Sequence, residues 1–213
     1  LAEKDGLKEI VVPCAACYNR LAVTQHDLNA DSDLKARVSD ILQMPLSGNI
    51  EVLNVMQFIE RYIADKIEEK VVTPFAHKVV CYYGCLLVRP HNIVKFDRLE
   101  DPQSMDILMR KIGAESMDWG FKTECCGAGF SVSRTDIVAK LGGKIVKDAT
   151  DRGAQAIIVA CPMCQSNLDM RRPHIDSYLK VKTTIPAMFI TQAIGLAVGI
   201  DRKELGLQKL FIV

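Results

Sequence analysis

The sequence is poor in aromatic residues and has almost no net charge. Aromatic side chains make up 6% of its 213 residues, and 27 basic side chains are balanced by 26 acidic ones, for a formal charge of +1. It contains no basic block and no aromatic-rich RNA-binding signature, so nucleic acid is not an expected partner. No G-x-G-x-x-G loop follows an expected strand, so any flavin or NAD should belong to partner proteins.

Long apolar runs are missing as well. The most apolar stretch, 185–200, contains Thr191, Gln192 and two glycines and is shorter than a membrane span, so it predicts a buried core helix. Residues 1–6 (LAEKDG) contain no apolar signal segment. We therefore expect a cytoplasmic protein without a membrane span.

Cysteine, in contrast, is abundant and clustered. The chain contains eight cysteines, and five of them follow the pattern C-x39-C-C-G-x33-C-x2-C. These five are Cys85, Cys125, Cys126, Cys161 and Cys164. A chain of 213 residues with 49% hydrophobic content can bury a core without disulfide staples. Clustered cysteines without an export signal therefore favour metal binding or redox chemistry over a disulfide framework.

One pattern occurs twice in the chain. Residues 10–21 (IVVPCAACYNRL) and 157–168 (IIVACPMCQSNL) each combine an apolar run, a CxxC motif, three further residues and a leucine in the same register. A second apolar segment follows each copy, at 51–59 and at 189–200. The pattern indicates an internal repeat, although short apolar runs can also match by chance.

The two copies differ in what precedes them. The second CxxC follows Cys85 and the Cys125-Cys126-Gly127 segment, whereas the counterparts of these in the first copy would lie before Leu1. We therefore expect residues 1–73 to be the C-terminal remnant of a first domain and residues 74–213 to be a complete second domain. On this interpretation we expect the chain to be either a fragment or a naturally shortened form of a two-domain protein.

The expected elements alternate between strands and helices. Short apolar strands are expected at 9–13, 78–82 and 156–160, and a long amphipathic helix is expected over 52–67. Strands separated by helices favour an α/β fold with a largely parallel sheet.

The cysteine pattern suits iron and sulfur better than a single zinc ion. Thiolate is a soft ligand that selects zinc, copper(I) or iron–sulfur centres. Two adjacent cysteines cannot easily serve one tetrahedral zinc, but they can bind different irons of a cluster. Five thiolates also exceed the four that a structural zinc or a regular cubane cluster takes. The surplus indicates an irregular iron–sulfur centre, and a zinc-stabilised structural domain is the remaining alternative.

Three segments carry a family resemblance. Residues 81–90 (CYYGCLLVRP), 124–128 (ECCGA) and 159–164 (VACPMC) resemble the cysteine-rich CCG domains of the heterodisulfide reductase B subunit. Residues 13–21 (PCAACYNRL) resemble the end of the first CCG domain, so the likeness covers essentially the whole chain. The resemblance implies pseudo-duplicated CCG domains with largely parallel sheets flanked by helices.

The resemblance also implies a cofactor and partners. The implied cofactor is a noncubane [4Fe–4S] cluster. The same five cysteines would bind this cluster and serve as the catalytic residues: Cys85, Cys125, Cys126, Cys161 and Cys164. In that family the centre cleaves a disulfide substrate by one-electron steps, with the two thiols held on cluster iron. Electrons arrive through a ferredoxin-like C subunit from a flavoprotein, the A subunit.

The first domain departs from the family pattern, because only Cys14 and Cys17 of its cysteines are present. If the chain is completed upstream, they are ligands of a second cluster. Otherwise this site is vestigial, binds something else such as zinc, or is completed by another chain.

Several other side chains have two interpretations. Cys81 is either a buried strand thiol or a substitute ligand. His91 follows Cys85 closely enough to donate a proton near the site, or else it lies on the surface. A set of basic side chains either steers an anionic disulfide or forms ordinary surface charge: Arg89, Lys122, Arg171 and Arg172.

The leading functional hypothesis is thus an oxidoreductase that acts on a sulfur group. The chain would be the iron–sulfur catalytic subunit of a heterodisulfide reductase-type complex, and this complex would reduce or form a disulfide. The alternative is an iron–sulfur electron-transfer module of another oxidoreductase complex.

Overall fold

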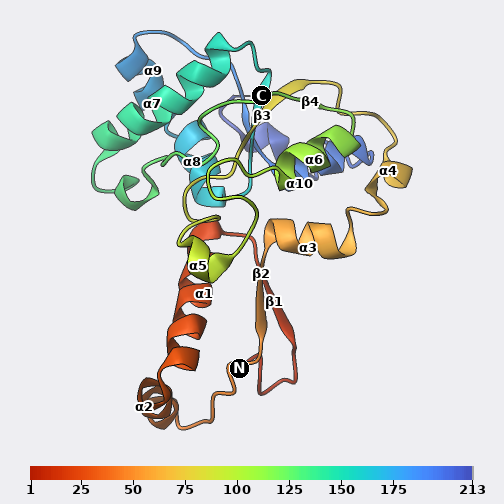
Figure 1. Ribbon diagram of the computed structural model, residues 1–213. Helices are drawn as coiled ribbons and strands as arrows, with labels where there is room; N and C mark the ends of the chain where they lie inside the picture. Colours follow the sequence, from red (N-terminus) through yellow and green to blue (C-terminus); the bar gives the residue numbers. More distant parts are fainter. Residues whose placement is uncertain (213) are drawn as a thin grey trace.

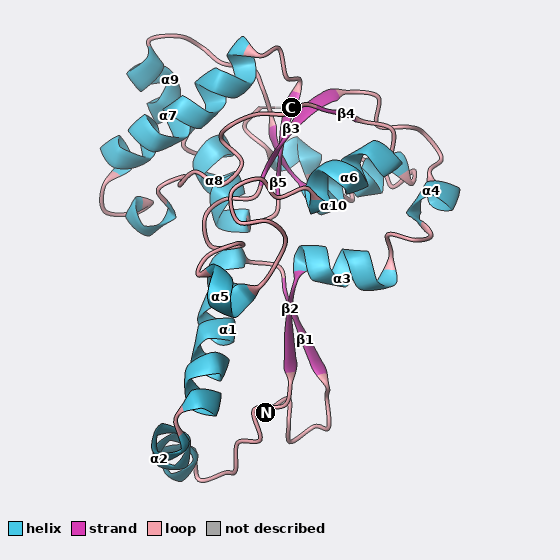
Figure 2. Cartoon of the chain, in the orientation of Figure 1, coloured by secondary structure: helices cyan, strands magenta, loops and turns pink. Residues whose placement is uncertain are grey.

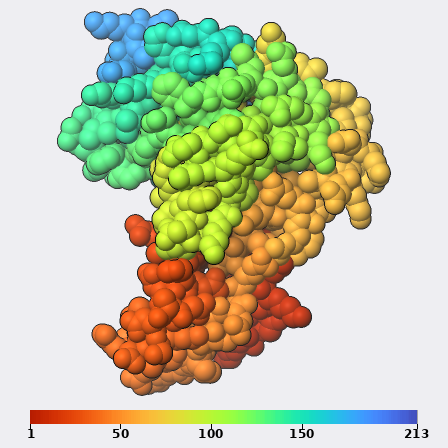
Figure 3. Space-filling view, in the orientation of Figure 1, coloured from red at the N-terminus to blue at the C-terminus, as the bar shows by residue number. Residues whose placement is uncertain are grey.

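The computed structural model describes residues 1–212 and contains two parallel sheets flanked by helices. Figure 1 shows an elongated chain, with the N-terminal part at one end and the larger sheet at the other. Figure 2 colours the helices and strands differently in the same view. Figure 3 shows that the molecule narrows between its two parts. The expected α/β class is confirmed.

The smaller sheet pairs β1 (Glu9–Val12) with β2 (Glu51–Asn54) in parallel. The larger sheet has the order β4-β3-β5-β6, and every neighbouring pair in it is parallel. Its strands are β3 (Lys78–Tyr82), β4 (Glu115–Ser116), β5 (Ala156–Val159) and β6 (Ala187–Phe189). The strands expected at 9–13, 78–82 and 156–160 are therefore present.

Helices follow or connect these strands. The N-terminal ones are α1 (Ala15–Ala30), α2 (Ser32–Leu42), α3 (Val55–Tyr62), α4 (Ile67–Lys70) and α5 (His91–Val94). The C-terminal ones are α6 (Ser104–Lys111), α7 (Thr135–Asp151), α8 (Pro162–Asp169), α9 (Arg172–Leu179) and α10 (Ile190–Ala197). Helices α7 and α9 pack side by side (Figure 1). No helix among residues 1–212 is long and apolar enough to cross a membrane.

The repeat in the sequence corresponds to a repeat of elements. In each copy a strand leads into a CxxC helix, and a second strand pairs in parallel with the first: β1, α1 and β2 in one copy, β5, α8 and β6 in the other. A helix then begins with the same contact, because Gln57 accepts from the Asn54 N–H (3.0 Å) and Gln192 accepts from the Phe189 N–H (2.9 Å).

Two helix predictions were wrong in part. The segment 52–67 begins as strand β2, and helix α3 starts only at Val55, where Asn54 caps it by accepting from the Met56 and Gln57 N–H groups. This helix ends at Tyr62, and a turn separates it from α4, which starts at Ile67. The segment 185–200 likewise contains strand β6 before α10. Each strand has two buried residues, and a strand of only three or four residues is too short for its periodicity to distinguish it from a helix.

Candidate metal centre

Five cysteines meet at the carboxyl ends of β3 and β5. Cys85 follows β3, Cys161 follows β5 as the N-cap of α8, and Cys164 lies in the first turn of that helix. Cys125 and Cys126 come from the loop that precedes α7. Because carboxyl ends of parallel strands share one edge of a sheet, the fold brings three segments together that are far apart in sequence.

The five thiols contact one another in hydrogen-bonded pairs. The sulfurs of Cys126 and Cys164 are 3.5 Å apart, Cys164 also pairs with Cys161, and Cys85 pairs with Cys125. Cys126, Cys161 and Cys164 are buried, Cys85 is half-buried, and Cys125 is exposed. The group is therefore open to solvent on the side of Cys125.

These contacts shift the pKa values of the thiols in opposite directions. Hydrogen bonding from Cys85 lowers the pKa of Cys125 to about 6, and hydrogen bonding from Cys164 lowers the pKa of Cys161 to about 5. The pKa of Cys126 is also lowered, chiefly by Cys164. The pKa values of Cys85 and Cys164 are raised. Hydrogen bonding thus favours the thiolate at three of the five positions, and thiolate is the metal-binding form.

Backbone N–H groups add to this preference. The Gly127 N–H donates to the Cys125 sulfur at 3.3 Å, and the Ala128 N–H further lowers the pKa values of Cys125 and Cys126. Gly127 has φ +79°, a conformation that favours glycine, and this turn points successive N–H groups at the sulfurs. The turn therefore forms a small anion-binding site around the adjacent cysteines.

A second position beside the thiols, Gly84, also requires glycine. Gly84 has φ +72°, and a Cβ atom there would lie 3.2 Å from the Cys164 sulfur. The neighbouring Tyr82 ring is fully buried near four of the thiols, and its hydroxyl donates to the Glu124 carbonyl at 2.6 Å. Tyr82 was not among the residues predicted for the site, although its position at the end of β3, two residues before Gly84, could have indicated it.

Cys14 of the first CxxC lies near one of these five thiols. Cys14 is the N-cap of α1. Its pKa is raised, chiefly by burial and to a lesser degree by the nearby Cys161. The Ala15 N–H in turn faces the Cys161 sulfur and helps to lower its pKa. Cys17 is exposed. The two CxxC helices therefore begin close together.

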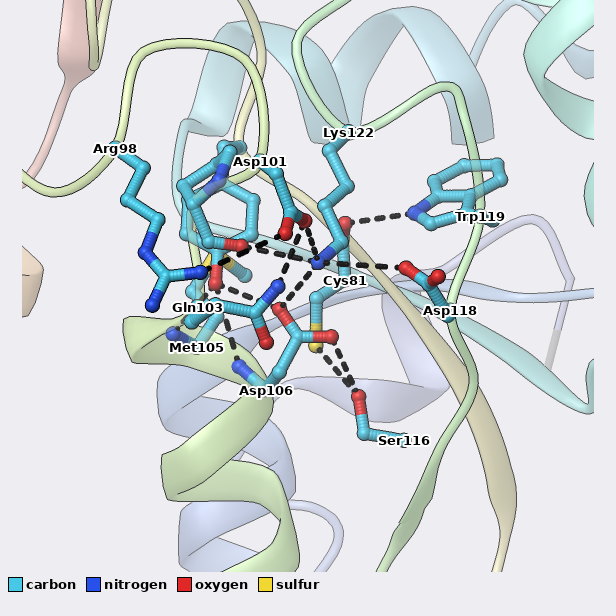
Figure 4. Close-up of polar contacts among 12 residues, drawn as sticks. Cys81, Arg98, Asp101, Gln103, Met105, Asp106, Ser116, Asp118, Trp119 and Lys122 are labelled. Carbon is cyan, nitrogen blue, oxygen red and sulfur yellow. Dashed lines mark hydrogen bonds and ion pairs between the residues drawn. The ribbon is translucent and has the colours of Figure 1, made fainter.

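Cys81 faces away from the five thiols. Its sulfur lies 3.6 Å from the Ser116 hydroxyl, and burial raises its pKa (Figure 4). Side chains alternate along a strand, so Cys81 and Tyr83 share the face of β3 that is opposite to Tyr82. This position matches a buried strand thiol.

Lys122 is buried in the same polar cluster as Cys81. Its ammonium lies 2.7 Å from Asp101, 3.5 Å from Asp106 and 3.8 Å from Asp118, and it donates to the Pro102 carbonyl (Figure 4). This ammonium is buried and paired with carboxylates of its own chain, so it does not face a substrate.

The candidate arginines are also engaged in internal contacts. Arg89 donates to the Thr123 carbonyl at 3.1 Å and pairs with Glu100, and Arg171 donates to the Ser131 carbonyl at 2.7 Å. Arg172 is buried against the Leu168 and Ile185 carbonyls. His91 is exposed at the start of α5. The arginines on either side of the Cys125-Cys126 loop therefore anchor that loop.

The donor set fits an iron–sulfur centre. Among residues 1–212, no three His, Cys, Asp or Glu side chains are placed to hold a single metal ion. Instead, five soft thiols are present, three of them favoured as thiolates and surrounded by N–H donors. Such ligands suit iron and sulfide in preference to a hard cation.

Comparisons with known proteins agree with this chemistry. The family model of the cysteine-rich CCG domain matches residues 79–169. Over 215 residues the chain is 30% identical to the B subunit of the ferredoxin/F(420)H(2)-dependent CoB-CoM heterodisulfide reductase of Methanosarcina acetivorans, covering 98% of this chain and 71% of that protein. It is 27% identical to the 8-methylmenaquinol:fumarate reductase membrane anchor subunit of Wolinella succinogenes, covering 97% of this chain and 73% of that protein.

A solved structure shares the fold. The crystal structure of a hypothetical protein from Helicobacter pylori matches with a TM-score of 0.80 at 15% identity. The match covers 100% of this chain and 40% of that one, so this chain spans less than half of its structural neighbour.

Proposed function

We propose that this chain, which belongs to the family of heterodisulfide reductase B subunits, is the iron–sulfur catalytic subunit of a heterodisulfide reductase-type complex. The relatives are reductase subunits, so the chain is an oxidoreductase component. The observation that carries the proposal is the meeting of five thiols from three segments at one edge of the sheet.

The proposed ligands are Cys85, Cys125, Cys126, Cys161 and Cys164, and the proposed cofactor is a noncubane [4Fe–4S] cluster. When bound, this group supplies one-electron chemistry. Reduction of a disulfide to two thiols consumes two electrons and two protons, and formation of a disulfide releases them. The electrons would pass through a ferredoxin-like C subunit from a flavoprotein A subunit, in the cytoplasm.

The chain's own residues hold and shield this site. The N–H groups of Gly127 and Ala128 stabilise the thiolates, and the buried ring of Tyr82 excludes water from the inner side. The exposed Cys125 lies at the solvent side, where a disulfide substrate would approach.

The two-domain organisation belongs to the same proposal. Residues 1–73 would be the remnant of a first CCG domain and residues 74–213 a complete second one. The repeated order of strand, CxxC helix and parallel strand supports this division. Cys14 and Cys17 would bind a second cluster, or zinc, in a chain completed upstream.

A different function has one observation in its favour. The chain is similar to a subunit of 8-methylmenaquinol:fumarate reductase as well as to heterodisulfide reductase subunits. An iron–sulfur electron-transfer module of another oxidoreductase complex would use the same ligands without binding a disulfide.

The first experiment is to measure iron, sulfide and zinc per chain after purification without oxygen. We expect about four irons per chain from the second unit alone. The Cys126→Ala variant should lose this iron, and zinc without iron in the wild-type protein would contradict the proposal. Electron paramagnetic resonance with and without an added disulfide then separates the two functions, because only the catalytic subunit should show a disulfide-dependent signal.

A further inference from the structure

Asn167 connects the CxxC helix to the loop that carries Cys126. It lies three residues after Cys164 on α8 and is completely buried. Its Nδ2 donates to the Cys126 carbonyl at 3.1 Å and lies 3.8 Å from the Cys126 sulfur. Its Oδ1 lies 2.7 Å from the Ser131 hydroxyl.

These partners determine the orientation of the amide. A backbone carbonyl can only accept a hydrogen bond, so the side of Asn167 that faces the Cys126 carbonyl must be the NH₂ group. An NH₂ group has two hydrogens, and the carbonyl uses one of them. The second partner within reach of Nδ2 is the Cys126 sulfur.

The loop has other anchors besides Asn167. Arg171 donates to the Ser131 carbonyl at 2.7 Å, and the Ser131 hydroxyl lies 2.8 Å from the Ala128 carbonyl. These contacts hold the end of the loop, whereas Asn167 is the side chain that reaches back to Cys126 itself. Its distinct contribution is therefore to the position and the electrostatics of one sulfur.

We propose that Asn167 is a positioning residue that orients Cys126 and donates to its sulfur, and that it thereby raises the reduction potential of the bound centre. This inference rests on the proposed function. Reduction adds negative charge to the cluster and its thiolates, and an N–H donor stabilises that charge more strongly in the reduced than in the oxidised state. Burial strengthens the effect because water does not screen it.

Asn167 contacts Cys126 on one side and Ser131 on the other. The test compares two variants, each of which removes one of these two contacts. Asn167→Leu removes the donor to Cys126 at similar volume, and Ser131→Ala removes the hydroxyl partner but leaves the donor in place. Both proteins are purified without oxygen, and their iron content and the midpoint potential of the centre are measured. We expect a shift to lower potential in Asn167→Leu and a potential close to that of the wild type in Ser131→Ala.

Each outcome bears on the inference. Equal shifts in the two variants would mean that Asn167 acts only through the structure of the loop, which overturns the proposal. If Asn167→Leu loses its iron, Asn167→Ala removes the N–H donor without adding a charge or a larger apolar side chain, and an unchanged potential there overturns the proposal as well. Wild-type protein without iron would sink both this inference and the proposed function, whereas iron with unshifted potentials would sink this inference alone.

Discussion

The ammonium of Lys122 lies 3.5 Å from the carboxylate of Asp106, and the two side chains are 3% and 1% exposed (Figure 4). The Lys122 carbonyl also accepts from the N–H groups of Tyr83 and Gly84, and the Tyr83 hydroxyl donates to Asp106 at 2.7 Å. This pair therefore joins the segment leading to Cys85 with the segment leading to Cys125.

Removing Lys122 should destabilise the fold. Lys122→Met leaves the Asp106 carboxylate buried without its cation, and we expect a loss of about 3–5 kcal/mol in the free energy of unfolding. The double variant Lys122→Met/Asp106→Asn should recover part of this loss, because no unpaired charge remains buried: the other two carboxylates near Lys122 are exposed. Chemical denaturation measures both effects. As a control, Lys147→Met breaks an exposed ion pair with Asp151 and should cost less than about 1 kcal/mol. Equal losses for the two lysines would refute this interpretation.

Cys81 should be dispensable for metal binding. Its sulfur faces Ser116 on the side of β3 away from the five thiols. We therefore expect Cys81→Ala to retain the wild-type content of iron and sulfide. Metal analysis of anaerobically purified protein is sufficient to test this, and a loss of iron comparable to that of Cys126→Ala would show that Cys81 is a ligand.

The reactivity of Cys125 should depend on Cys85 in the metal-free chain. With its pKa lowered to about 6, Cys125 is mostly thiolate at neutral pH, and the thiolate is the form that reacts. Its alkylation rate should therefore rise with pH and reach half of its maximum near pH 6. Cys85→Ala removes the hydrogen-bond donor, which raises the pKa and moves this midpoint to higher pH.

Alkylation followed by mass spectrometry across a pH series measures that midpoint. Cys85→Ser is the matched variant, since its hydroxyl can still donate, and it should shift the midpoint less than Cys85→Ala. An identical midpoint in wild type and Cys85→Ala would contradict the assigned donor.

Gly84 should tolerate no side chain. Both Gly84 and Gly6 have positive φ angles, of +72° and +71°, so alanine at either position should cost roughly 1–2 kcal/mol of stability. Only at Gly84 would the new Cβ also lie against the Cys164 sulfur, at 3.2 Å, whereas Gly6 has open space around it. Gly84→Ala should therefore reduce iron content, and Gly6→Ala should not. Full iron content in Gly84→Ala would show that Cys164 can move without consequence.

Asn19 should hold helix α1 against the segment after Cys85. Its buried amide donates to the carbonyls of Leu86 and Arg89. Asn19→Leu leaves both carbonyls without this donor, and we expect a cost of about 1–3 kcal/mol with faster hydrogen exchange over 86–94. Asn29→Leu, at the exposed end of the same helix, is the control. Unchanged exchange in the Asn19 variant would mean that the contact does not stabilise the docking of α1.

Local pattern predicted several parts of this molecule well. The apolar runs before the two CxxC motifs became strands β1 and β5, and the repeated pattern became a repeated set of elements. These features depend on residues that are neighbours in sequence, so periodicity and motif spacing can reveal them. Periodicity failed at 52–67 and at 185–200, where a short buried strand runs directly into a helix.

The residue pattern alone revealed the number of soft thiols, their spacing, and the glycines that allow close approach to them. The roles of individual side chains became clear only from the packing of the fold. It turned Cys81 toward Ser116, buried Lys122 among carboxylates, and placed Asn167 beside Cys126. These roles depend on contacts between segments that are far apart in sequence, and such contacts are set by how strands and helices pack.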